Sequence, residues 1–119
     1  MIDHLELRTM KMDESARFYA GVLAPLGYQR KVEGESLGFG DGRGLDLFLA
    51  PGEPSTNVHY AFAADSRELV DRAWAAGSDG GHQLDRAPAL MPHIHADYYA
   101  GFLRDPDGRL VEIVCHRPE

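Results

Sequence analysis

The second half of this 119-residue chain repeats the pattern of its first half in weakened form. Each half opens on a histidine within an alternating stretch, His4-Leu5-Glu6-Leu7 and His59-Tyr60-Ala61-Phe62, and each closes on a phrase containing Asp-Gly-Arg. When Gly42 is set on Gly108, Asp46 falls on Glu112 without a gap. A repeated unit that carries one histidine and one carboxylate predicts a divalent-metal site built from two half-sites.

The first half has the pattern of a strand, a helix and three further strands. Alternation predicts a strand over 2–8, and apolar residues at helical spacing predict a helix that Asp13 caps and that ends near Ala24. Turn residues divide the following segment into short strands, expected at about 28–33, 37–40 and 45–49. The segment 51–56, rich in Pro and Gly, is the expected linker.

The second half repeats this order. A strand is expected over 58–63, followed by a helix that starts at a capping box of Asp65 and Glu68 and runs through Ala76, with Gly77 after it. The stretch 78–97 is rich in Gly, Pro and His and holds one short strand near 83–84, and a hairpin then covers 98–104 and 109–116. Two βαβββ modules, about 1–50 and 57–119, predict one α+β domain over 1–119.

Charge and composition exclude several classes of partner. Twelve basic against nineteen acidic residues give a formal net charge of −7, which argues against binding of nucleic acid or a membrane surface. No apolar run approaches the roughly 20 residues of a membrane span, and the first residues lack the features of a secretory signal. The single cysteine, Cys115, forms no internal disulfide, so we expect a cytoplasmic protein in which Cys115 is a buried strand residue.

Strand alternation places both histidines on the face opposite to the expected core. His4 lies opposite to Leu5 and Leu7, and His59 lies opposite to its apolar neighbours. Two surface histidines are the simpler alternative. Their equivalent positions in the repeat, each with an equivalent carboxylate, favour a shared metal site instead.

The two carboxylates, Glu112 and Asp46, could likewise be metal ligands or have another partner, because each lies in an apolar strand. Glu112 is flanked by apolar residues on both faces, and such a carboxylate is costly to bury unless it is paired or bound to a cation. The alternative to a metal is an ion pair with an arginine such as Arg8 or Arg109. Asp46 stands in a similar apolar segment.

Four side chains near the last hairpin are further candidates. His93 and His95 share a face in extended chain, so they could bind metal, bind an anionic substrate or transfer protons, and an exposed loop is the alternative. Tyr98 and Tyr99 point to opposite faces of their strand, so we expect one to pack in the core and the other to reach the functional face; the sequence does not say which, and Tyr98 is taken as the candidate.

Three segments resemble the vicinal oxygen chelate superfamily, which includes glyoxalase I, extradiol dioxygenases, fosfomycin-resistance proteins and bleomycin-binding proteins. They are Asp13–Tyr19, Phe102–Glu112 and the stretch Pro92–Phe102, which is similar to a bacterial glyoxalase-like subgroup. The resemblance covers essentially the whole chain. It implies that the two modules form a cupped, mostly antiparallel sheet with helices on the outside and a divalent metal in the cup.

The resemblance implies ligands on the first and last strands of each module: His4, His59 and Glu112, with Asp46 where glyoxalase I carries a longer Glu. This donor set suits Zn, Ni, Mn, Co or Fe(II). Glu112, His95 and Tyr98 are the expected catalytic groups, and substrate contacts are expected from His93, His95, Tyr98 and Phe48, although Phe48 could equally be a core residue. A homodimer is also expected.

The resemblance favours a glyoxalase-like lyase or isomerase that acts on a small oxygenated molecule chelated by the metal. Two alternatives stay open. Two histidines and one carboxylate are also the ligand set of an extradiol-type dioxygenase. A metal-free protein that binds a drug or a metabolite, as bleomycin-binding relatives do, would need no metal at all.

Overall fold

The chain folds into the two predicted modules. A computed structural model describes residues 1–119, and each module has the order βαβββ. The first consists of β1 (Leu5–Thr9), α1 (Met12–Leu23), a 3-10 turn (Ala24–Leu26), β2 (Gln29–Glu33), β3 (Ser36–Gly40) and β4 (Leu47–Pro51). The second consists of β5 (His59–Ala63), α2 (Arg67–Asp79), β6 (Ala89–Leu90), β7 (Tyr99–Arg104) and β8 (Leu110–Cys115). The α+β prediction is confirmed.

The strands form two four-stranded sheets, one for each module. Their orders are β1-β4-β3-β2 and β5-β8-β7-β6, so the two modules have the same topology. In each sheet the first strand lies parallel to the last strand of its module, and the other pairs are antiparallel. The edge strands β1 and β5 each have one side without a strand partner.

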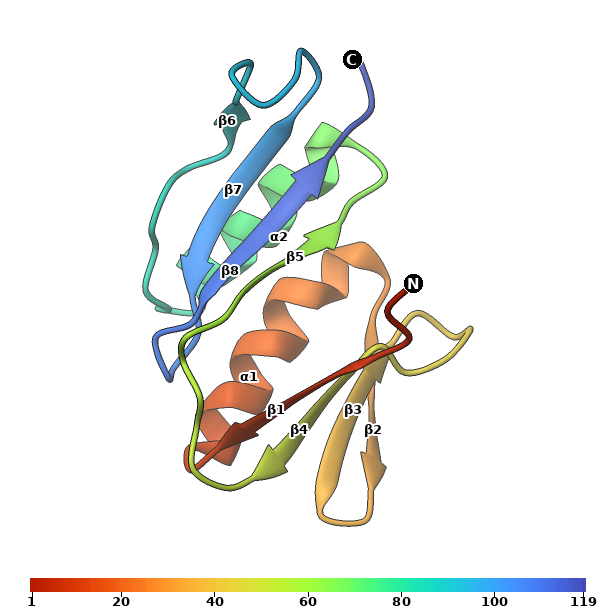
Figure 1. Ribbon diagram of the computed structural model, residues 1–119, viewed down its shortest axis with the longest axis vertical. Helices are drawn as coiled ribbons and strands as arrows, with labels where there is room; N and C mark the ends of the chain where they lie inside the picture. Colours follow the sequence, from red (N-terminus) through yellow and green to blue (C-terminus); the bar gives the residue numbers. More distant parts are fainter.

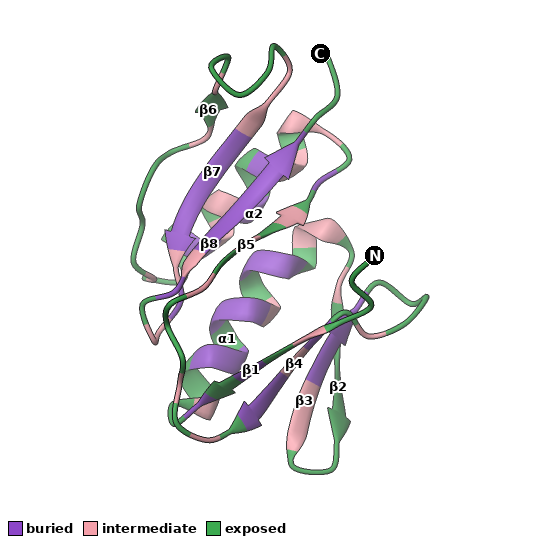
Figure 2. Ribbon diagram, in the orientation of Figure 1, coloured by how far each residue is buried: buried purple, intermediate pink, exposed green.

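One hydrophobic core joins the modules through their helices. Figure 1 shows α1 between the two sheets, and α2 behind β7 and β8. The helices pack on each other, and the core takes Phe18, Tyr19 and Val22 from α1 and Val70 and Ala73 from α2. In Figure 2, β7 and β8 are buried along most of their length, whereas β2 is exposed throughout. Neither helix has the length and the continuous apolar character that a bilayer crossing requires.

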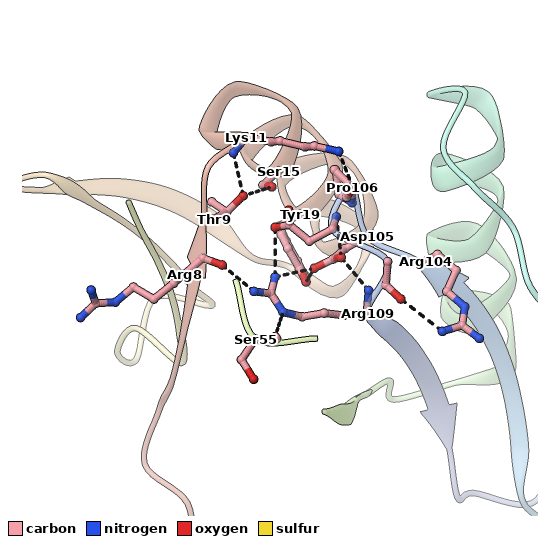
Figure 3. Close-up of polar contacts among 12 residues, drawn as sticks. Arg8, Thr9, Lys11, Ser15, Tyr19, Ser55, Arg104, Asp105, Pro106 and Arg109 are labelled. Carbon is pink, nitrogen blue, oxygen red and sulfur yellow. Dashed lines mark hydrogen bonds and ion pairs between the residues drawn. The ribbon is translucent and has the colours of Figure 1, made fainter. Parts of the chain in front are cut away.

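A buried polar network also ties the modules together (Figure 3). The Arg109 guanidinium is 1% exposed and donates to Asp105 Oδ2 at 2.9 Å, to the Ser55 carbonyl oxygen at 2.9 Å and to the Arg8 carbonyl oxygen. The Tyr19 hydroxyl donates to the same Asp105 oxygen at 2.6 Å. The Arg109 side chain, directly before β8, is therefore hydrogen-bonded both to the linker and to the end of β1.

The helix ends differ from the predicted ones. Asp13 lies in the first turn of α1, and the preceding Lys11 amide donates to Thr9 Oγ1 at 2.9 Å. Ser66 caps α2, because its hydroxyl accepts from the Leu69 amide at 3.2 Å. The helix α2 does not end at Gly77 but continues to Asp79.

Two further differences concern α2 and the segment that follows it. Gly77 is a packing position, since an added Cβ would lie 2.4 Å from Leu103 Cδ2. The short strand expected near 83–84 is wrong as placed. Leu84 makes only an isolated bridge to Leu103, and the strand of this segment, β6, lies at Ala89–Leu90.

Candidate functional site

The strongest cluster of functional side chains lies on the face of the second sheet that α2 does not cover. Glu112 on β8 is paired with Ala61 on β5 and with Phe102 on β7, so the three side chains form a row across this face. A small apolar cluster surrounds the row, formed by Ala100, Phe102 and Val114 with Met91, Tyr98 and Leu110 packed against it. Glu112 is 3% exposed. A carboxylate in such surroundings needs partners.

Glu112 finds those partners in a histidine and a tyrosine. His59 Nε2 lies 2.9 Å from Glu112 Oε1, and the Tyr98 hydroxyl donates to Glu112 Oε2. The two arginines considered as alternatives are engaged elsewhere: Arg109 pairs with Asp105, and Arg8 pairs with Glu6 at 2.9 Å. An arginine partner for Glu112 is therefore wrong.

The contact of the other ring nitrogen, Nδ1, fixes the tautomer of His59. His59 Nδ1 lies 3.2 Å from the Leu110 carbonyl oxygen, and because a carbonyl can only accept, Nδ1 carries a proton. A neutral ring then has its lone pair on Nε2, facing the carboxylate of Glu112. A proton shared between the two groups, or a metal ion bound by both, would stabilise that contact.

The geometry of the pair fits a metal ion. Two neighbouring ligands bound at right angles, at about 2.1 Å from one ion, lie about 3 Å apart. His59 Nε2 and Glu112 Oε1 are 2.9 Å apart, and the backbone bond at Nδ1 is a common support for a ligating histidine. Imidazole and carboxylate are ligands for Zn, Ni, Mn, Co and Fe(II). These two residues thus fit half of a metal site.

Tyr98 completes this cluster as a neutral donor. Burial raises the pKa of Tyr98 to about 12, with further contributions from the hydrogen bond and the negative charge of Glu112. The phenol therefore keeps its proton near neutral pH. Tyr99 points elsewhere and donates to Asp71 on α2 at 2.6 Å, so Tyr98 is the tyrosine that reaches Glu112, which the sequence alone left open.

The first module brings His4 and Asp46 to the start of its parallel strand pair. His4 Nδ1 lies 2.7 Å from Asp3 Oδ1, and its ring meets the Phe48 ring edge-on, with centroids 5.4 Å apart. Asp46 Oδ2 accepts from the Tyr28 hydroxyl at 2.7 Å. Burial and the hydrogen bond to Asp46 raise the pKa of Tyr28.

The strand register corrects the equivalence of Asp46 and Glu112. In the first module Phe39 pairs with Leu47, and in the second Leu103 pairs with Val111, after loops of the same length. The residue after Leu47 is Phe48, which therefore stands where the second module has Glu112. The contact of His4 with Phe48 then corresponds to that of His59 with Glu112. Asp46 lies two residues earlier, so the repeat no longer supports it as a ligand.

A cavity of about 500 Å³ lies between the edge strands β1 and β5. His4 and Asp46 line it from the first module and His59 from the second, and the rest of its lining is mainly apolar. Within a single chain, no three His, Cys, Asp or Glu side chains gather closely enough to hold one metal ion.

Three further histidines, His93, His95 and His116, lie beside the site rather than in it. His95 Nε2 is 2.9 Å from His116 Nδ1, the two rings stack, and both meet the Tyr98 ring edge-on. His93 is exposed on the same loop. The sequence reasoning missed His116, which directly follows β8, and Arg86, whose guanidinium lies 4.0 Å from the Phe102 ring centroid. Neither His116 nor Arg86 belongs to a helix or strand, and each meets its partner only through a tertiary contact.

Solved structures of known proteins share this fold. A glyoxalase/bleomycin resistance protein from Albidiferax ferrireducens superposes with a TM-score of 0.81 at 24% identity, covering 98% of each chain. The fosfomycin resistance protein FosX from Mesorhizobium loti gives 0.72 at 17% identity, covering 98% of this chain and 92% of that one. Lactoylglutathione lyase from Agrobacterium tumefaciens gives 0.69 at 22%, covering 97% and 92%.

Identities at this level show the fold alone. No match was found among curated protein sequences. The family is shown by a sequence model that matches residues 1–113, nearly the entire chain. The topology of the two βαβββ modules agrees with that match. The chain belongs to the Glyoxalase/Bleomycin resistance protein/Dioxygenase superfamily.

Proposed function

We propose that this protein is a metal-dependent lyase or isomerase that acts on a small oxygenated molecule. The single observation that carries the proposal is the placement of His59, whose Nδ1 meets the Leu110 carbonyl oxygen while Nε2 meets the nearly buried Glu112 carboxylate. A cation satisfies both groups, and a divalent ion bound there would polarise substrate oxygens as a Lewis acid. The cytoplasm is the proposed location, which suits a single free and buried thiol.

The third ligand in this proposal is His4 from a second copy of the chain. His4 and His59 stand on different sheets, and these sheets are joined through α1 and α2 on their covered faces. The uncovered face of one module is therefore free to receive the other module of a second copy. A symmetric homodimer would form two identical sites in this way. Light scattering at micromolar concentration should give twice the monomer mass, and a monomer would contradict this arrangement.

In this proposal, Glu112 and Tyr98 of the second module carry out the transfer of a substrate proton. Glu112 is the acceptor, because its carboxylate is held between His59 and Tyr98 on a largely apolar face. Tyr98 keeps its own proton, since its pKa is raised to about 12, and so it orients Glu112 and donates a hydrogen bond. The Glu112 side chain is 4% exposed, so little water reaches its carboxylate.

A second candidate function is an extradiol-type dioxygenase. The observation that favours it is Phe48, which occupies the position equivalent to Glu112 and so removes a fourth protein ligand. Two histidines and one carboxylate are the facial ligand set of non-haem Fe(II) oxygenases. Anaerobic reconstitution with Fe(II), followed by catechols and air, separates the two candidates: a coloured ring-opened product supports the dioxygenase.

Metal analysis of the purified protein tests the proposed site. The wild type should contain bound divalent metal, and the His59→Ala variant should lose it. His93→Ala is the matched control, since this exposed histidine lies on a nearby loop and should leave the metal content unchanged. Equal metal content in wild type and His59→Ala would reject the site, and wild type that binds no metal would favour a metal-free binding protein.

A further inference from the structure

Arg86 stands on the same row of side chains as Glu112. Its backbone forms a reciprocal pair with Phe102: the Arg86 amide donates to the Phe102 carbonyl oxygen at 3.2 Å, and the Phe102 amide donates to the Arg86 carbonyl oxygen at 2.8 Å. Residues paired in this way project to the same face. Phe102 is itself paired with Glu112. The order across the face is therefore Glu112, Phe102, Arg86.

The guanidinium of Arg86 lies over the ring of Phe102, the residue between Arg86 and Glu112 in this row. Arg86 Cζ lies 4.0 Å from the centroid of Phe102, a cation–π contact. The ring of His59 stacks against the same Phe102, with centroids 6.2 Å apart and an interplanar angle of 28°. Phe102 thus forms a platform that has His59 and Glu112 at one end and a fixed positive charge at the other.

The charge of Arg86 is only weakly balanced by the protein. Its single ion-pair contact joins Nε to Asp85 Oδ1 at 3.4 Å, a long distance for a charged pair. Asp85 is also held by Arg104, whose Nε and Nη2 both lie 3.2 Å from Asp85 Oδ2. The terminal nitrogens of Arg86 have no hydrogen-bond partner, and its side chain is 58% exposed. They are free to bind an anion.

We propose that Arg86 binds the carboxylate of a small substrate whose oxygenated end lies at His59 and Glu112. A guanidinium with one face on an aromatic ring offers its N–H edge, which matches a planar carboxylate in a bidentate pair. Two strand spacings separate the backbones of Arg86 and Glu112 by roughly 10 Å, and a ligand that bridges them across Phe102 is small. The inference rests on the proposed function for the position of the reacting end.

Binding of two isosteric probes tests this. Levulinate carries a ketone and a carboxylate, and levulinamide replaces the carboxylate with a neutral amide. NMR titration of the purified protein should show levulinate binding at least about tenfold more tightly, as expected for a charge-assisted pair. Arg86→Gln should abolish that preference. Arg72→Gln is the control, because it removes the same charge from an exposed position on α2 and should retain the preference.

Each outcome bears on the inference. Equal binding of the two probes by the wild type, or a preference that survives in Arg86→Gln, overturns it. Inorganic phosphate as competitor identifies the anion: phosphate bound more tightly than levulinate overturns the carboxylate assignment, and weaker binding supports it. Metal content is measured on the same samples. Metal without a carboxylate preference rejects only this inference, whereas an Arg86-dependent preference without metal supports it and rejects the proposed lyase.

Discussion

Asp105 and Arg109 form a buried ion pair, with Oδ2 and Nη1 2.9 Å apart and neither residue more than 2% exposed. Both partners make additional hydrogen bonds, Asp105 with the Tyr19 hydroxyl and Arg109 with two carbonyl oxygens from the linker and β1. The pair is therefore one of the polar connections between the two modules.

Removal of one partner should destabilise the whole fold. Asp105→Asn removes the nearer counter-charge of the buried Arg109 and leaves only Asp107 Oδ2 at 3.4 Å, so we expect a loss of about 3 kcal/mol in the free energy of unfolding. The control is Asp41→Asn, which weakens a solvent-exposed pair with Arg43 at 3.8 Å and should cost less than about 1 kcal/mol. Denaturant unfolding measures both. Similar losses in the two variants would contradict a structural role for the buried pair.

Two helical glycines should respond in opposite directions to alanine. In α2, Gly77→Ala places a Cβ 2.4 Å from Leu103 Cδ2 in a fully buried contact, so overpacking should cost about 1–3 kcal/mol. In α1, Gly21 has nothing within 4 Å of an added Cβ, so Gly21→Ala should stabilise the protein by up to about 1 kcal/mol. Thermal melts decide this, and a stabilised Gly77→Ala variant would show that the contact is not tight.

Periodicity predicted the architecture because each element buries one face. The alternation around His59 and the helical spacing around Tyr19 identify strands and helices directly, and their order repeats. The same alternation correctly placed His59 on the face without a helix, where it meets Glu112. Alternation left open which of Tyr98 and Tyr99 reaches that face, and the structure shows that the Tyr98 hydroxyl meets Glu112.

What the sequence could not provide is the register between distant strands. The similarity of the two Asp-Gly-Arg phrases aligned Asp46 with Glu112, whereas hairpin pairing makes Phe48 the equivalent residue. Local similarity there reflects turn chemistry: the two loops have the same length, but the Asp-Gly-Arg phrase stands two residues later in the second loop than in the first. Arg86 was missed for a related reason, since its irregular segment meets Phe102 only through tertiary pairing.

The alkaline titration of the tyrosines provides a test of the packing. All five tyrosines have a pKa raised above 10.0, and that of Tyr98 and Tyr99 is raised to about 12, mainly by burial. The unfolded chain releases these protons first, so the folded state binds more protons between these two values and stability falls as pH rises through them. Tyrosinate absorbance should stay low at pH 10 in the folded protein and reach its usual midpoint in denaturant. An ordinary midpoint in the folded protein would contradict this.

Glu112→Gln should separate metal binding from folding. The amide can still accept from Tyr98 and can donate to His59 Nε2, so the melting temperature without metal should change little. Wild type should gain about 2.7 kcal/mol when the metal concentration is 100 times its Kd, and the variant should gain none. Glu6→Gln, at an exposed position on β1, is the control for the lost charge. An equal metal-induced gain in Glu112→Gln would exclude this carboxylate as a ligand.

Mixed dimers test whether one site draws on two chains. If His4 of one chain joins His59 and Glu112 of another, each dimer has two sites, and each single variant, His4→Ala or His59→Ala, damages both sites of its own homodimer. A heterodimer of the two variants then has one site with both substitutions and one site with neither. Co-refolded and purified heterodimer should therefore recover about half of the wild-type metal content, the ratio set by dimer symmetry. A site built within one chain would leave each chain of the heterodimer with a defect, so a heterodimer without metal would reject the shared arrangement.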